Sequence, residues 1–471
     1  MESSISSDPA LRFVEMFEAS EQATDEARQN SELARDYYDN KQYTEEEVAE
    51  LKKRGQPVIV DNVIAGKVNW LIGQEMATRT DPKGFPRTPQ HEKGAEAVTD
   101  AIRFVCDNND WDEKRSEVWK NLLVEGFGGV NVGHVYKRRG PEITIKHIPW
   151  DRLFYDPHSR KPDFSDARYK GEVIWSDADE LQKKHPKLKD QIDGALNRTH
   201  TLGETYEDRP THQIWGDKER NRVRVVLMHY LEDGVWKWVK FSYGLVLDRG
   251  ESQYVDEDGE SLCPLIMESA YVDRENNRYG EVHKLISQQD EINKRRSKLL
   301  HMANSRQTMG EKGAIDSVKA LKRELARPDG HVEYNPGVDG KRPFEIIPNA
   351  DIAASQFALL QEAKESIRGM GATEALQGSA DGDSGRAVLA KQQGAMRAIT
   401  PLTDRLHRFT LRVYEAIWMR VRQLWTEEKW IRVTDDEHNI KFVGLNRPVT
   451  LAEELQVLSS DAQKNMAGAQ R

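Results

Sequence analysis

The sequence predicts a mainly helical protein of the α+β class. Two long segments with helical character, 281–305 and 351–370, flank a 45-residue polar insert that has its own Pro and Gly. A very long helix is predicted at 386–425, because apolar residues recur there at alternating steps of four and three. Between residues 128 and 248 the apolar residues instead follow the shorter period of strands.

The N-terminal quarter of the chain is predicted to be helical. Apolar residues at helical intervals indicate a helix over 9–40. Thr44 and Glu47 have capping-box spacing, so a second helix should begin there and end at Gly55. The stretch 81–89 is rich in Pro and Gly and should form a loop. Three more helices are expected, at 62–77, 90–107 and 112–125.

The middle of the chain is predicted to form strands. These strands are expected at 128–137, 142–148, 213–218, 221–232, 235–242 and 244–248. Asp233 and Gly234 have the composition of a hairpin turn. The acidic stretch 256–259 lacks the third ligand and the final Glu of a calcium loop, so a plain turn is expected. Two short strands, at 430–434 and 439–443, should close the ordered part.

The two long helices around the insert predict a projecting stalk. At about 1.5 Å rise per residue, the segment 281–305 could reach roughly 37 Å. A thin stalk buries little apolar surface alone, so neighbouring subunits are expected around it. In the insert, a helix is predicted at 314–327. Strands are predicted at 331–335 and 344–347, and their lack of a partner suggests pairing across subunits.

The long helix near the C-terminus combines an apolar stripe with a proline. Pro401 should kink the helix, because it cannot donate a hydrogen bond to the carbonyl of Arg397. The preceding stretch 371–385 is rich in Gly, Ser and Asp and should form a mobile loop. The stripe consists of Val388, Gln392, Ala395, Ile399, Leu402, Leu406, Phe409 and Val413.

Charge and composition limit the possible functions. The formal net charge of −10 is carried by the first 50 residues, which hold 14 acidic and 4 basic side chains. A neutral remainder is not typical of a tight, non-specific DNA binder, so any DNA contact should be weak or local. Cys106 and Cys263 are too few for a disulfide framework or a zinc site. The sequence predicts neither a transmembrane helix nor a secretory signal.

The sequence carries no recognisable catalytic motif. It has no phosphate-binding loop and no nucleophile elbow, and HEKGA at 91–95 lacks the second His of a zinc protease. The acidic run 45–47 lies at a predicted helix start, where acidic side chains complement the helix dipole. We therefore expect no enzyme activity, no cofactor and no metal.

The long helix is basic, and two interpretations of this charge are possible. Segment 386–425 has eight basic and two acidic side chains. In the first interpretation they form a solvated face whose arginines pair with acidic neighbours. In the second, Arg386, Lys391 and Arg397 lie near passing phosphate groups. The later arginines are expected to face other subunits or other segments of the chain.

Four segments, in a fixed order, carry a family resemblance. They are DYYDNKQYTEEEVAELKKRGQPVIVDNVIAGKVNWLIGQE (36–75), PWDRLFYDPHSRKPDFSDARY (149–169), CPLIMESAYVDRENNRYGEVHKLISQQDEINKRRSKLL (263–300) and SGRAVLAKQQ (384–393). The first three resemble, in turn, the N-terminal signature, the segment before the wing strands and the run into the stem helix of portal proteins from short-tailed, double-stranded-DNA bacteriophages. The fourth adds to this resemblance by its place in the order. The resemblance spans residues 36–430.

This resemblance implies a portal fold and a ring, typically a dodecamer, at one vertex of the capsid. An α/β wing, a two-helix stem, a small α/β clip and a long kinked wing helix would make up the subunit. The parts would be the N-terminal arm and wing (1–280), stem (281–305 and 351–370), clip (306–350), tunnel loop (371–385), long wing helix (386–430), and wing end or start of a crown (431–471).

The resemblance also implies a function and partners. The ring would be a conduit for double-stranded DNA during packaging and ejection, located in the virion and, during assembly, in the host cytoplasm. Its partners would be the terminase large subunit, which hydrolyses ATP, the tail adaptor, and the major capsid and scaffolding proteins. Candidate channel residues are Arg386, Lys391 and Arg397, and candidate clip contacts are Lys319, Lys322, Arg323 and Phe344.

Two rival functions remain open at the level of sequence. The heptad-like stripe and the acidic N-terminus would also suit a coiled-coil scaffold without a DNA channel, which should form dimers to tetramers rather than closed rings. A phage nuclease or protease would need a metal or nucleophile constellation that the sequence does not display.

Overall fold

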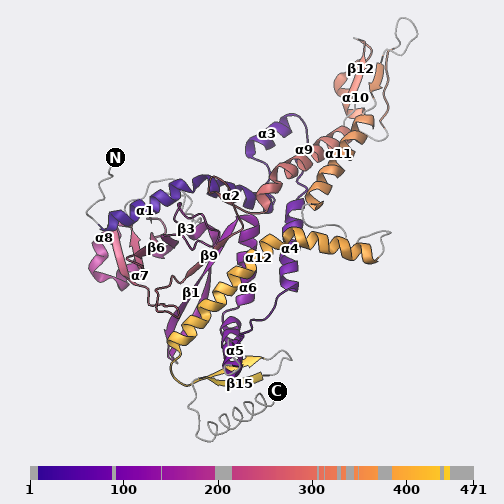
Figure 1. The fold of residues 1–471 in the computed structure, drawn as a ribbon. Helices are drawn as coiled ribbons and strands as arrows, with labels where there is room; N and C mark the ends of the chain where they lie inside the picture. Colours follow the sequence, from indigo (N-terminus) through magenta and orange to yellow (C-terminus); the bar gives the residue numbers. More distant parts are fainter. Residues whose placement is uncertain are drawn as a thin grey trace.

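The computed structural model describes an α/β body from which a pair of helices projects, with a small module at their far end (Figure 1). The described residues are 9–86, 92–138, 140–196, 215–304, 307–311, 313–325, 330–335, 344–347, 350–369, 385–434 and 440–445.

Helices dominate the described residues, as the sequence predicted. They are α1 (Pro9–Ala23), α2 (Asp25–Tyr38), α3 (Glu45–Lys53), α4 (Val63–Ala77), α5 (Glu92–Asn108), α6 (Trp111–Val124), α7 (Ala178–Lys184), α8 (Lys189–Leu196), α9 (Ile286–Asn304), α10 (Val318–Leu325), α11 (Ala350–Gly369) and α12 (Gly385–Leu424). The predicted capping box of α3 is confirmed, because the Glu47 amide donates to Thr44 Oγ1 over 3.2 Å and the Thr44 amide donates to Glu47 Oε2 over 3.1 Å.

The single helix expected over 9–40 is wrong, since the chain forms α1 and α2. Thr24 separates them with φ −105° and ψ 7°. Its hydroxyl donates to the Ser20 carbonyl over 2.7 Å and accepts from Arg28 Nε over 3.0 Å. Such local side-chain bonding competes with regular helix geometry.

The strands form several small antiparallel sheets. They are β1 (Phe127–Lys137), β2 (Gly140–Ile148), β3 (Leu153–Tyr155), β4 (Tyr169–Asp177), β5 (Gly216–Asp217), β6 (Arg222–Glu232), β7 (Val235–Ser242), β8 (Leu245–Glu251), β9 (Leu265–Ser269), β10 (Tyr271–Val272), β11 (Arg278–Tyr279), β12 (Gln307–Gly310), β13 (Phe344–Ile347), β14 (Lys429–Thr434) and β15 (Ile440–Leu445). The larger sheets have the orders β3-β4-β6-β7-β8, with β5 beside β6, and β2-β1-β9; the others are the pairs β10-β11, β12-β13 and β14-β15.

Both predicted turns in this region are confirmed. Asp233 and Gly234 have φ values of 55° and 79°, as the tight turn between β6 and β7 requires. In the stretch 256–259, the Asp256 carboxylate accepts from the amides of Asp258 and Glu260 over 2.9 and 2.8 Å. That carboxylate therefore stabilises its own turn.

The acidic N-terminal segment is part of the body from residue 9 onward. Phe13 and Phe17 of α1 are 5% and 0% exposed and pack on the six-stranded sheet. Beneath them, Arg224 Nη2 pairs with Glu21 Oε1 over 2.8 Å, and its guanidinium lies 5.1 Å from the Phe17 ring centroid. The helix thus contributes both apolar and ionic contacts to the core.

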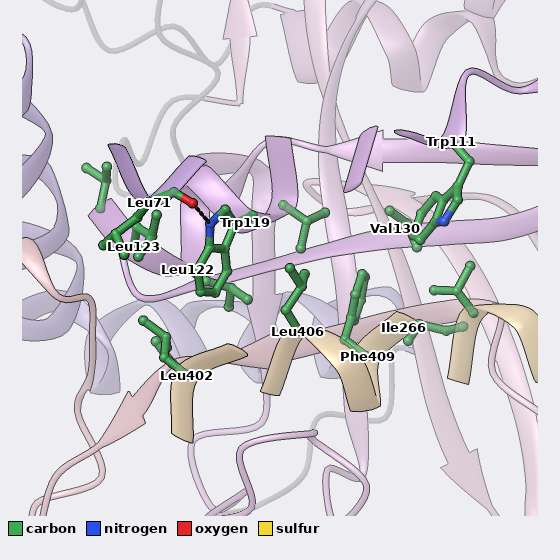
Figure 2. Packing of buried hydrophobic residues seen from close by; sticks show 14 of the residues in the cluster. Leu71, Trp111, Trp119, Leu122, Leu123, Val130, Ile266, Leu402, Leu406 and Phe409 are labelled. Atoms are coloured by element: carbon green, nitrogen blue, oxygen red, sulfur yellow. Dashed lines mark hydrogen bonds between the residues drawn. The ribbon is translucent and has the colours of Figure 1, made fainter. Parts of the chain in front are cut away.

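The main core lies where α12 crosses the three-stranded sheet and α6. Figure 2 shows Leu402, Leu406 and Phe409 of α12 facing Trp119 and Leu122 of α6. All five side chains are at most 3% exposed. Pro401 lies inside α12, and Figure 1 shows that the helix is bent, as predicted. The described part of the stripe, from Ile399 to Val413, therefore packs against the chain's own core.

The structure corrects the prediction for the insert between the projecting helices. The helix expected over 314–327 is the shorter α10, and 331–335 forms no strand because the Asn335 amide donates to the Ala314 carbonyl over 2.9 Å. Strand β13 pairs with β12 of the same chain. The stated reason for strand pairing across subunits, the lack of a partner, was therefore wrong. Most of the loop predicted at 371–385 lies outside the described residues.

Replacing Phe409 with Ala should destabilise the body by about 3–5 kcal/mol, because the side chain is fully enclosed and a cavity would remain. Leu411→Ala on the same helix is the matched control, since Leu411 is 45% exposed and should change stability by less than about 1 kcal/mol. Urea unfolding followed by circular dichroism measures both. Equal losses in the two variants would contradict the assignment of this face to the core.

Candidate functional site: the projecting helices and the long helix

The projecting pair is fixed to the body by a row of buried polar side chains on α9. Gln289, Asn293 and Ser297 are spaced by four residues, lie on one helix face and are at most 1% exposed. Gln289 Nε2 donates to the Asp61 carbonyl over 2.7 Å, and Gln289 Oε1 accepts from the Val63 amide over 3.1 Å. Asn293 Oδ1 accepts from the Asp61 amide over 2.9 Å. These bonds satisfy backbone groups of the segment that leads into α4, and this segment is not part of a strand.

An ionic contact at the same place joins the second projecting helix. The Asp61 carboxylate pairs with Lys364 Nζ of α11 over 2.6 Å and also with Arg296 of α9. Burial opposes its charge, but the hydrogen bonds and charges of these two cations lower the Asp61 pKa overall. One carboxylate therefore holds both helices against the body.

Further along, the projecting pair exposes apolar side chains. Helices α9 and α11 pack side by side, and Arg295 Nη1 donates to Gln356 Oε1 across them over 3.2 Å. Leu300, Phe357 and Leu359 are 42%, 52% and 38% exposed. Other apolar residues of α11, near the body, are buried in the main core. The exposed apolar side chains of the outer part are typical of a surface that contacts another protein.

The module at the far end carries the predicted clip contacts. Lys319, Lys322 and Arg323 are exposed on α10. Phe344 is the first residue of β13 and pairs with Gly310 through the backbone, and its side chain lies outside the described part. Beside these, Met309 and Ile346 of the two-stranded sheet are 63% and 39% exposed. The structure thus brings the basic helix and an apolar strand pair into one small module.

The predicted channel residues lie on α12, which follows the projecting helix α11 in the chain. Arg386, Lys391 and Arg397 all belong to its first half, although their side chains are outside the described part. Figure 1 shows this end of α12 extending beyond α4, away from the core. The structure therefore places these three residues on one helical segment, separate from the clip candidates.

The later arginines of α12 pair with the chain itself. Arg412 Nη2 lies 2.6 Å from Glu268 Oε2 of β9, and Arg405 Nη1 lies 3.9 Å from Glu268 Oε1. Arg408 and Arg422 form further ion pairs within the chain. For Arg405, Arg408, Arg412 and Arg422 the first interpretation, pairing with acidic neighbours, is confirmed. Arg420 differs, because it is buried and forms no ion pair with a described residue.

Glu268 is the focus of this ionic cluster and was not found by sequence reasoning. It is 2% exposed, and burial raises its pKa to about 7 although Arg412 and Arg405 favour the charged form. The local sequence does not reveal its ion pairs, because its partners come from a helix about 140 residues away. A buried acid in an otherwise apolar strand is the only signal it offers.

Among the described residues, neither a metal-ion cluster nor a membrane-spanning helix is present. No group of three His, Cys, Asp or Glu side chains there is arranged to hold a metal ion. None of the helices in this part combines the length and hydrophobicity needed to cross a bilayer.

Comparison with known proteins gives the class: a structural, non-enzymatic component of a bacteriophage. A family model for phage P22-like portal proteins matches residues 14–469, and the chain belongs to this family. The chain is also 20% identical over 424 residues to a portal protein of Helicobacter pylori bacteriophage KHP30. That match covers 88% of this chain and 66% of the relative, slightly less than two thirds of its length.

The family assignment confirms the resemblance found in the sequence. It identifies the protein as a phage portal protein. The family is not one of enzymes, and neither the coiled-coil scaffold nor the nuclease or protease is favoured.

The raised pKa of Glu268 predicts a pH effect. Its ordinary pKa is 4.5 and its folded value is about 7, so between these values the folded state binds the extra proton and stability falls as pH rises. This group alone should lower the free energy of unfolding by about 3 kcal/mol between pH 4.5 and 7.5. Glu268→Gln should remove that part of the slope, measured by urea unfolding at several pH values.

Glu257→Gln is the control for this prediction. Glu257 also pairs with an arginine of α12, Arg422, but this pair is exposed to solvent. Glu21 and Glu125 also have pKa values raised to about 7 by burial, so a residual slope is expected in every variant. If the Glu268→Gln protein loses stability with pH as steeply as the parent, the assignment is wrong.

Proposed function

We propose that the protein assembles into a ring at one vertex of the capsid and forms the passage for double-stranded DNA during packaging and ejection. The observation that carries the proposal is the projecting pair α9 and α11. Its base is fixed by buried polar and ionic contacts, whereas its outer part leaves Leu300, Phe357 and Leu359 exposed. Copies standing side by side would cover these side chains.

In this proposal each part of the chain has a place in the ring. The body would be the wing, α9 and α11 the stem, and the module of β12, α10 and β13 the clip. Residues 371–385 would be the tunnel loop, α12 would cross the wing, and the segment after 430 would end the wing or begin a crown. The subunit number would be twelve, as is typical of the family that the sequence resembles.

DNA contact would come from the first half of α12. Arg386, Lys391 and Arg397 lie there, at the end of the helix that extends away from the core. The chain outside the first 50 residues is neutral overall, which supports a weak and sliding contact in preference to a tight one. A passage that bound its DNA tightly would slow the movement it has to permit.

The clip would dock the terminase large subunit during packaging and the tail adaptor afterwards. Its exposed Lys319, Lys322 and Arg323 would give charge complementarity to those partners, and Phe344 would add an apolar contact. ATP hydrolysis would belong to the terminase. The major capsid and scaffolding proteins would contact the wing, in the host cytoplasm during assembly.

Phe357→Asp should reduce ring formation while leaving each subunit folded, because a charge would be placed in an apolar contact between copies. Each contact should weaken by about 2–3 kcal/mol, or roughly 30- to 150-fold. Gln361→Asp on the same helix is the matched control, since Gln361 is already polar and exposed. Sedimentation and negative-stain images measure ring content. Rings that form equally well in both variants, or a parent without rings, would refute the proposed stem contact.

Reversing the three charges of α10, with Lys319→Glu, Lys322→Glu and Arg323→Glu, should preserve rings but weaken terminase binding by at least about ten-fold. The control reverses three exposed lysines on the body, Lys183, Lys184 and Lys187. Binding is measured with purified rings and terminase at two salt concentrations. If both triple variants bind as the parent does, the clip docking surface is wrong.

A further inference from the structure

A cavity of about 350 Å³ lies in the body between α12, the start of β4 and the segment before β9. Lys170, Arg412 and Arg420 line it together with Trp236 and Cys263. Three cationic side chains thus line one partly open cavity. This cavity lies away from the projecting pair and from the first half of α12, so the proposed DNA passage does not use it.

Arg420 is the most unusual of these cations. It is 0% exposed, and none of its three guanidinium nitrogens has a hydrogen-bond partner in the described part of the chain. In the described part of the chain its guanidinium carbon lies 4.1 Å from the centroid of the Tyr254 ring, a cation–π contact. Burial lowers the Arg420 pKa to about 10, but the group remains charged at neutral pH. A buried charge without a counter-charge is strongly unfavourable.

Lys170 presents a second cation to the same space. It is 7% exposed and makes no ion pair with any described residue, and its Nζ lies 5.7 Å from the Trp236 ring centroid. Its cross-strand neighbour His229 cannot supply a negative charge, because burial and the nearby Lys170 lower the His229 pKa to about 3 and leave it neutral. Burial also lowers the pKa of Lys170 itself.

Three carboxylates, from Asp163, Asp256 and Glu415, also line the cavity, but within the described residues none of them forms an ion pair with Lys170 or Arg420. Asp256 accepts from two amides of its own turn, and Asp163 accepts from the Ser165 amide over 3.1 Å. Glu415 is exposed and also lines the adjacent cavities along α12. Arg412, the third cation, is already paired with Glu268. Asp163 favours the charged form of Lys170, so Arg420 is the cation to which no described carboxylate supplies a counter-charge.

We propose that this cavity is a binding site for a small oxyanion of the phosphate type, held by Arg420 and Lys170. A guanidinium offers a planar fork of donors and an ammonium adds a point charge, a combination that suits a tetrahedral oxyanion. The volume admits such an ion with water. Because Arg420 is buried, it can be approached only through the cavity, which a small free ion can enter and a DNA duplex cannot.

Cys263 reports occupancy of the site. It lines the cavity, is partly exposed, and has a pKa that burial raises while Lys170 and Arg420 oppose the increase. An anion bound between the two cations would block the thiol and cancel their effect on it, so alkylation should slow for both reasons. Cys106 is an internal control, since it is buried and does not line this cavity.

The test measures the rate of Cys263 alkylation by N-ethylmaleimide in the full chain, with inorganic phosphate or with chloride at equal ionic strength. At a phosphate concentration about ten times the dissociation constant, labelling should slow about ten-fold, because roughly a tenth of the sites stay empty. Chloride should give no comparable protection, and Cys106 should not respond to phosphate. Peptide mass spectrometry separates the two thiols.

Lys170→Met and Arg420→Gln should each weaken phosphate protection by at least about ten-fold, since each removes a charged donor. Arg408→Gln on the same helix should retain it, because Arg408 is exposed and paired with Asp404. If Arg420→Gln does not fold by circular dichroism, Lys170→Met alone decides.

Three results would overturn the proposal. They are an alkylation rate that does not respond to phosphate, equal protection by chloride, and protection that persists in Lys170→Met. Cys263 that is protected in assembled rings without phosphate, but reactive in separated subunits, would overturn it as well, because a neighbouring copy would then fill the cavity. None of these outcomes depends on DNA passage, so the portal function can stand or fall separately.

Discussion

The polar face of α9 is the constraint on which the rest of the molecule depends. Gln289 and Asn293 lie in a fully buried position, where an unpaired amide would cost about 1–3 kcal/mol, and each is satisfied by the backbone around Asp61. Hydrogen bonds have directional requirements that apolar contacts lack, so this face sets the angle at which the helix leaves the body. Asp61 adds Lys364 to the same point and fixes the second helix with the first.

Helix α12 has two parts in different surroundings, because its second half packs in the core and its first half extends away from it. Its second half contributes Phe409 and the other buried members of the stripe, and its arginines pair with acidic groups such as Glu268. Its first half extends beyond α4. Pro401 lies between these two parts, where a missing backbone donor weakens the helix locally. The bend therefore falls where the helix changes from core element to projecting element.

Local chemistry made most of the elements predictable. The capping box at Thr44 and the turn at Asp233 act within a few residues, so the sequence alone carries their signal. The pairing of β12 with β13 spans the whole insert, and no local pattern in the strand at 307–310 announces it. Buried charges such as Glu268 and Arg420 were missed for the same reason. Gln289 and its partners could have been found, because polar residues repeated every four positions on a long helix indicate a buried polar face.

Two kinds of side chain in the described residues lack a partner: exposed apolar side chains and a buried cation. Each kind would be stabilised by a different type of partner. On the outer part of α9 and α11, Phe357 and Leu300 are exposed, and apolar surface of that kind is stabilised by a large complementary protein surface. In the body, Arg420 is enclosed, and a charge in that setting is stabilised only by something small enough to enter. An assembly of identical copies can satisfy the first without changing the second. In the two proposals these groups therefore act independently, the exposed side chains in contacts between copies and Arg420 in stabilising the single subunit.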